Sequence, residues 1–124
     1  MSNEQKIIDV SRYVRPEIAL KAIRRVLEED MGMGWDEFVG IDRKARQVEL
    51  RTTAIEAFFR MSSDPAHHLT EEAAAEMLGM TRGRVHYHRE RYASFASIYK
   101  GYTFGVDSME AAARDYVELW TESR

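Results

Sequence analysis

Apolar residues recur at helical spacing along nearly the whole chain, and this periodicity limits the possible folds more than any other feature of the sequence. The C-terminal segment shows it best, because apolar residues lie one helical turn apart there, at Met109, Ala112, Ala113, Tyr116 and Trp120. The sequence has no useful length of alternating apolar and polar residues, the pattern of half-buried strands. We therefore predict an all-α protein of five or six helices, formed as a single domain over residues 1–124.

Local start and stop signals divide these periodic segments into helices. Pro16 suits the first turn of a helix that continues to about residue 30, and "MGMGW" then breaks the chain before a short turn, "WDEFVG". Asp42 is expected to cap a long helix that ends near Met61. Further along, "GYTFG" predicts another break, after which Asp107 and Glu110 form a capping pair for an amphipathic C-terminal helix.

Two helices are predicted between these outer segments, joined by a tight turn. Thr70 can cap a short helix that ends at about Leu78, and Gly79 can take the positive φ that the turn requires. Thr81 can then cap a second helix that continues to about Lys100. The inward stripe expected on this second helix is Val85, His88, Tyr92, Phe95, Ala96 and Tyr99.

Residues 71–92 have the features of a helix-turn-helix. Close crossing of the two helices needs a small residue in the first, glycine in the turn and an apolar residue that locks the second in place. Ala75, Gly79 and Val85 stand at those positions, and Leu78 and Met80 flank the turn. In DNA-binding proteins with this motif, the start of the second helix enters the major groove.

The start of this second helix carries residues suited to DNA. An arginine can donate two hydrogen bonds to guanine, so Arg82 is the predicted base reader. Thr81 and Arg84 suit phosphates, because they lie at the positive end of the helix dipole. His86 and Tyr87 are close enough along the helix to reach bases or sugars.

The charge is unevenly distributed, although the chain as a whole carries −3. Residues 81–100 hold five bases and one acid, and residues 41–60 hold five bases and three acids. By contrast, residues 61–80 hold four acids and no Lys or Arg, and residues 101–124 hold five acids and two bases. Two basic blocks in an acidic protein favour a localised DNA-binding surface.

A longer stretch carries a family resemblance. "DMGMGWDEFVGIDRKARQVELRTTAIEAFFRM", followed by "LTEEAAAEMLGMTRGRVHYH", resembles the C-terminal DNA-binding domain of the bacterial replication initiator DnaA and, more broadly, the Trp-repressor-like helix-turn-helix group. The similarity covers roughly residues 16–95. In that family a basic segment leads into a long helix, and the helix-turn-helix follows; Arg43, Lys44 and Arg46 match the basic segment here.

The resemblance implies that the basic segment contacts the minor groove and the DNA backbone while the second helix reads the major groove. It does not imply the initiator's target site, because the family's Arg-Asp-His-Thr-Thr is replaced here by Thr-Arg-Gly-Arg-Val. No ATPase domain or phosphate-binding loop is present in this sequence, so initiator activity is not implied either. The predicted DNA-binding residues are Arg43, Lys44, Arg46, Thr81, Arg82, Arg84, His86 and Tyr87.

Other functions have less support in the sequence. No nucleophilic triad, phosphate loop or spaced ligand cluster stands out, so we expect neither an enzyme nor a metal or other cofactor. His88 is predicted to be a partly buried, hydrogen-bonded histidine, and His67 and His68 to be solvated in a loop. The chain has no cysteine, no apolar span and no signal-peptide pattern, which predicts a cytoplasmic protein away from membranes.

Two questions about partners stay open at the level of sequence. The C-terminal helix, residues 101–124, can fold onto its own domain or pair with a second copy, because helix-turn-helix proteins commonly bind DNA as dimers. The alternative to DNA binding is a protein-interaction module, an inhibitor or adaptor, that keeps the helix-turn-helix shape and binds a protein through its acidic surfaces.

Overall fold

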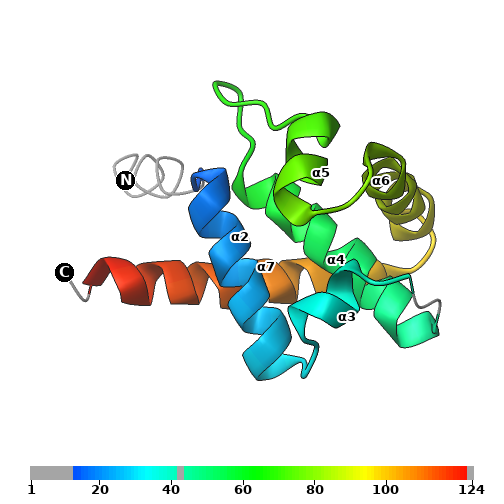
Figure 1. The fold of residues 1–124 in the computed structure, drawn as a ribbon, viewed down its shortest axis with the longest axis horizontal. Coiled ribbons are helices and arrows are strands. Elements are labelled where there is room, and N and C mark those ends of the chain that lie inside the picture. Colours follow the sequence, from blue (N-terminus) through cyan, green and yellow to red (C-terminus); the bar gives the residue numbers. More distant parts are fainter. Residues whose placement is uncertain (1–12, 42–43, 123–124) are drawn as a thin grey trace.

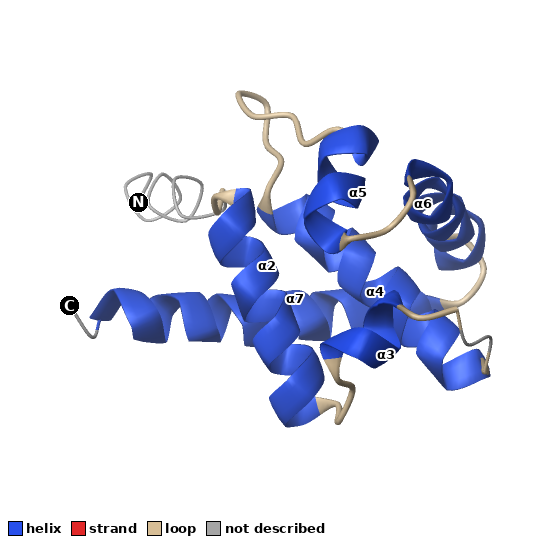
Figure 2. Cartoon of the chain, viewed as in Figure 1, coloured by secondary structure: helices blue, strands red, loops and turns tan. Residues whose placement is uncertain are grey.

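The computed structural model describes residues 13–41 and 44–122, and it confirms the all-α class (Figure 1). Figure 2 shows that every regular element drawn for these residues is a helix. In chain order the elements are α2 (Pro16–Arg25), the π-helical turn η1 (Val26–Asp30), α3 (Trp35–Val39), α4 (Ala45–Met61), α5 (Glu71–Leu78), α6 (Arg82–Ala96) and α7 (Lys100–Glu122).

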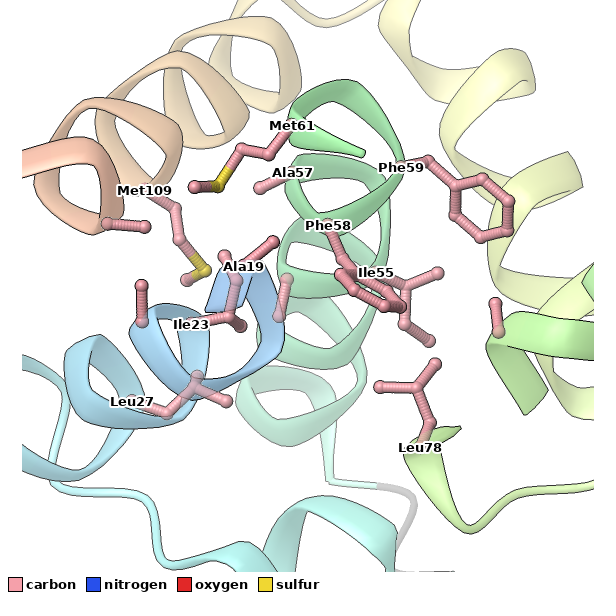
Figure 3. Close-up of a cluster of buried hydrophobic side chains, with 14 of the residues drawn as sticks. Ala19, Ile23, Leu27, Ile55, Ala57, Phe58, Phe59, Met61, Leu78 and Met109 are labelled. Carbon is pink, nitrogen blue, oxygen red and sulfur yellow. The ribbon is translucent and has the colours of Figure 1, made fainter. Parts of the chain in front are cut away.

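The long helix α4 lies at the centre of the fold. It packs on α2, α6 and α7, while α5 packs on α6. Figure 3 shows Ile23 of α2 and Met109 of α7 on one side of α4, and Leu78 of α5 on the other. Phe58 and Ile55 of α4 are fully buried within this cluster. Burial of each such side chain stabilises the fold by about 1.5–3 kcal/mol. Because α4 packs on helices on both of its sides, it connects α2 and α7 to α5 and α6.

The first half of the chain follows the sequence prediction closely. One continuous helical segment begins at Pro16 and ends at Asp30, although its last turn is π-helical, and the short turn at Trp35–Val39 is α3. The start of α4 differs from the prediction. Its N-cap residue is Lys44, with no side-chain cap, whereas the predicted cap, Asp42, lies outside the described residues.

The predicted boundaries of α5 and the start of α6 are confirmed. The Oγ1 of Thr70 accepts a hydrogen bond from the backbone N–H of Ala73 at 3.0 Å, and the Oγ1 of Thr81 accepts one from Arg84 at 3.2 Å. Gly79 ends α5 in the left-handed conformation, with φ +73°, which favours glycine. Three residues therefore separate α5 from α6.

The predicted boundary between the last two helices is wrong. Helix α6 ends at Ala96 instead of near Lys100, and the predicted break "GYTFG" is the first part of α7. As a result Tyr99, expected on the buried stripe, is 54% exposed. Two glycines in a helix cost about 1 kcal/mol each. The neighbouring turns of α7 offset this cost because they bury Val106, Met109 and Ala113 against α2 and α4.

The capping pair predicted at Asp107 and Glu110 is also wrong, because both residues lie well inside α7. They bind Arg60 of α4 instead: its Nη1 lies 2.6 Å from Oδ1 of Asp107 and 3.7 Å from Oε1 of Glu110. The two acids therefore connect α7 to α4. Their three-residue spacing, which resembles a capping pair in the sequence, serves a tertiary contact instead.

Candidate nucleic-acid interface

The first two turns of α6 present an exposed face next to the turn that follows α5. Thr81, Arg82, Gly83 and His86 are exposed, and Tyr87 is 55% exposed. Arg82 takes part in no ion pair or hydrogen bond among the described residues. No residue of the described part of the chain therefore engages its five N–H donors.

Arg84, predicted to contact a phosphate, is partly buried and has partners within the chain. Its Nη1 donates to the carbonyl oxygen of Val39 at 2.8 Å, and its Nη2 to that of Gly40 at 2.6 Å. These carbonyls end α3, where a cation is favoured by the helix dipole. The guanidinium thus connects α3 to α6. These two bonds use two of its five N–H donors.

His86 lies between two carboxylates. Its Nδ1 is 3.1 Å from Oε1 of Glu71 in α5, and its Nε2 is 3.5 Å from Oε2 of Glu90 one turn along α6. Both acids place negative charge beside the ring, which disfavours a phosphate there. The contact with Glu71 joins α5 to α6 across the turn.

The basic segment is described only in part, because Arg43 lies outside the described residues. Lys44 and Arg46 are exposed at the start of α4. The Nη2 of Arg46 donates to the carbonyl oxygen of Met31 at 2.8 Å, beyond the end of η1. Both predicted cations are therefore at the surface, and both also have a partner within the chain.

The remaining arginines of α6 make contacts within the fold. Arg89 bonds Glu56 at 3.1 Å and lies 3.8 Å from the ring centre of Phe59. Arg91 donates to the hydroxyl of Tyr102 at 2.7 Å. Most arginines of this basic stretch therefore have partners within the chain. Among the arginines of α6, Arg82 is the one without a partner in the described part of the chain.

His88 confirms the expectation of a buried, hydrogen-bonded histidine. It is 4% exposed, and its Nδ1 lies 2.8 Å from Oγ1 of Thr52 in α4. Burial lowers the pKa of His88 to about 4, and the positive charges of Arg51, Arg84 and Arg91 add to this effect. At neutral pH the ring is uncharged and joins α6 to α4.

A cavity of about 670 Å³ lies between the starts of α4 and α6, and Thr81, Gly83 and Tyr87 of the exposed face are part of its lining. Sequence reasoning missed it, because its walls come from three separate segments whose contacts no local pattern indicates. We call it the α4–α6 cavity; it is lined by Ile41, Ala45, Val48, Arg51, Thr81, Gly83, Arg84, Tyr87, His88 and Arg91. The structure thus brings Thr81, Arg84 and Tyr87 from the predicted DNA-binding set around one cavity.

The loop histidines occupy separate settings. The Nδ1 of His67 lies 2.9 Å from Oδ1 of Asp64, and its ring stacks on Tyr13 with ring centres 3.8 Å apart, whereas His68 is exposed. In residues 13–41 and 44–122, no group of three or more His, Cys, Asp or Glu side chains is placed to hold a metal ion. None of the helices described is both long and apolar enough to cross a bilayer.

Comparison with known proteins adds no relative. No protein-family model matches the chain, and neither a curated protein nor a solved structure gives a match. The resemblance to the initiator domain therefore stays a prediction from sequence.

Proposed function

We propose that this protein binds double-stranded DNA through the exposed face of α6, as a regulator of transcription or an accessory to replication or recombination. The observation that carries the proposal is Arg82, an exposed arginine without a partner among the described residues, in the first turn of α6 after a three-residue turn. A helix-turn-helix places this part of its second helix against base edges.

In the proposed complex, Arg82 donates to a guanine in the major groove, and Tyr87 contacts bases or sugars one turn further along. Thr81 at the helix start and Lys44 at the start of α4 contact phosphates. Arg84 also has a structural role, since its bonds to Val39 and Gly40 hold α3 beside α6.

Selection from a randomised duplex pool at two salt concentrations tests this proposal. The wild-type chain is compared with Arg82→Gln and with Arg15→Gln, which removes the same charge from an exposed arginine whose Nη2 lies 3.8 Å from Oε2 of Glu17. We expect wild type and Arg15→Gln to enrich the same motif. Arg82→Gln should lose preference at one base pair, at a cost of about 1–3 kcal/mol.

The salt dependence gives a second readout. Binding through several phosphates weakens steeply as salt rises. Retention that is unaffected by salt, or a motif that Arg82→Gln enriches as well as wild type does, would contradict the proposed interface.

One observation favours the alternative, a protein-interaction module. Ile98 and Phe104 are 69% and 72% exposed at the junction of α6 and α7, next to the half-exposed Tyr99. Large apolar side chains gathered at a surface are typical of protein contacts. No retention of DNA at low salt by the wild-type chain would favour this second function.

A further inference from the structure

The α4–α6 cavity has the size and shape of a ligand site. Its volume of about 670 Å³ falls within the range of about 300–1,000 Å³ that is typical of small-molecule pockets. Its walls belong to the loop after α3, to α4 and to α6, all of which are tied together by hydrogen bonds. The site is therefore largely formed before any ligand enters.

The charged side chains that line the cavity are all cationic. Arg51, Arg84 and Arg91 line it, and none of the described lining residues is an acid. Arg51 and Arg84 donate to carbonyl oxygens of α3 and of the residue after it, which fixes the position of their guanidinium groups. These three arginines are also the charges that depress the pKa of the adjacent His88.

Arg91 contributes charge to the cavity wall and has partners of its own. Its Nη2 donates to the hydroxyl of Tyr102, and its guanidinium lies 4.8 Å from the ring centre of Phe95. Its Nε is buried and makes no hydrogen bond, so Arg91 adds positive charge to this side of the cavity without offering that donor to a ligand.

The backbone adds to the positive field. The first turns of α4 and α6 both contribute to the lining, and neither contains an acidic residue. The start of α4 also has no side-chain cap. Free N–H groups at a helix start favour an anion.

The other part of the lining is apolar. Ala45, Val48 and Ile41 line it together with the ring of Tyr87, and Ile41 is 84% exposed. A phosphate or carboxylate group alone is much smaller than this space. The lining therefore matches a molecule with an anionic group at the arginines and an apolar or aromatic body against Ile41 and Tyr87.

We propose that the α4–α6 cavity binds a small organic oxyanion, a phosphate or carboxylate carried on an apolar or aromatic body. The arginines and the two helix starts hold the anionic group, and Ile41, Val48 and Tyr87 enclose the body. This binding does not depend on the proposed contact with DNA, since it needs only the protein and the ligand.

Phenyl phosphate is a suitable probe, with benzyl alcohol as a neutral molecule of similar size. In an amide NMR titration of the full chain without DNA, phenyl phosphate should shift the backbone amides of residues 45–48 and 81–84 saturably. Benzyl alcohol should leave them unchanged at the same concentrations. Absence of saturable shifts with phenyl phosphate, or equal shifts with benzyl alcohol, would overturn the proposal.

A matched pair of glycine substitutions tests the location. Gly83 lines the cavity, and a Cβ built there meets no atom within 4 Å, so Gly83→Asp places a carboxylate at the site without a clash. Gly83 and Gly101 are each the second residue of their helix, and a Cβ built at Gly101 also meets no atom within 4 Å. Gly101 does not line this cavity, so Gly101→Asp makes the same charge change away from the site.

An aspartate in the first turn of a helix is favoured by the dipole, so both variants should fold, and a thermal melt checks this. We expect Gly83→Asp to weaken phenyl phosphate binding at least tenfold and Gly101→Asp to leave it within twofold of wild type. Equal weakening in the two variants, or none in Gly83→Asp, would show that the shifts arise from general charge or from another site. Because no DNA is present, this result is independent of the selection experiment.

Discussion

The neutral, buried state of His88 predicts a specific loss of stability in mild acid. The pKa of this ring is lowered from its ordinary 6.5 to about 4 in the folded protein. Between these values the unfolded chain binds a proton at this histidine that the folded chain does not, so stability falls as pH falls through this window. At about 1.4 kcal/mol per pKa unit the full effect is about 3 kcal/mol, of which about 2.5 kcal/mol lies between pH 7.5 and pH 4.5.

Urea unfolding of wild type and His88→Gln at a series of pH values measures this loss. The substitution also disturbs the bond to Thr52, so the relevant quantity is the difference between the two pH dependences rather than the stability at one pH. Wild type should lose about 2.5 kcal/mol more than His88→Gln between pH 7.5 and pH 4.5. His68→Gln, which removes an exposed histidine, should keep the wild-type pH dependence.

Equal acid losses in wild type and His88→Gln would refute this reasoning. So would an NMR titration in which the His88 ring of the folded protein gains its proton near pH 6.5, because burial among arginines would then have no net effect on the ring.

Three further predictions concern stability and can be checked by urea unfolding at neutral pH. Gly79→Ala should destabilise by about 1 kcal/mol because its φ is +73°, whereas Gly83→Ala, in an open helical position, should stabilise by about 0.4–1 kcal/mol. Thr81→Ala should cost about 1 kcal/mol through the lost cap of α6. Asp107→Asn should cost less than about 1 kcal/mol, and less still in high salt, because the Asp107 side chain is 59% exposed despite its 2.6 Å contact with Arg60.

The parts of the fold that sequence predicts well are those set by neighbouring residues. The caps at Thr70 and Thr81 act on N–H groups three residues away, and the left-handed turn at Gly79 is a property of that residue. Such signals are complete within one helical turn, so no knowledge of the tertiary fold is needed to interpret them.

The features that the sequence did not predict depend on contacts between segments that are far apart in the chain. Gly101 and Gly105 predict a break because glycine weakens an isolated helix, but burial of the following turns of α7 against α2 and α4 outweighs that local cost. The bonds of Arg84 to the carbonyls of Val39 and Gly40, more than 40 residues earlier in the chain, have no local signal in the sequence. The α4–α6 cavity depends on the same kind of distant contact.

The arrangement of arginines on α6 has a consequence for any study of DNA binding by this chain. Substitution of Arg84 removes a support of α3 and a wall of the cavity, so weaker DNA binding by such a variant would not identify a phosphate contact. Arg82 has no such internal part among the described residues, so its substitution changes charge and hydrogen-bonding capacity at the surface without loosening the fold. We therefore expect Arg82→Gln to lose base preference while its free energy of unfolding stays unchanged. That result would distinguish base recognition by α6 from the contribution of α6 to the stability of the fold.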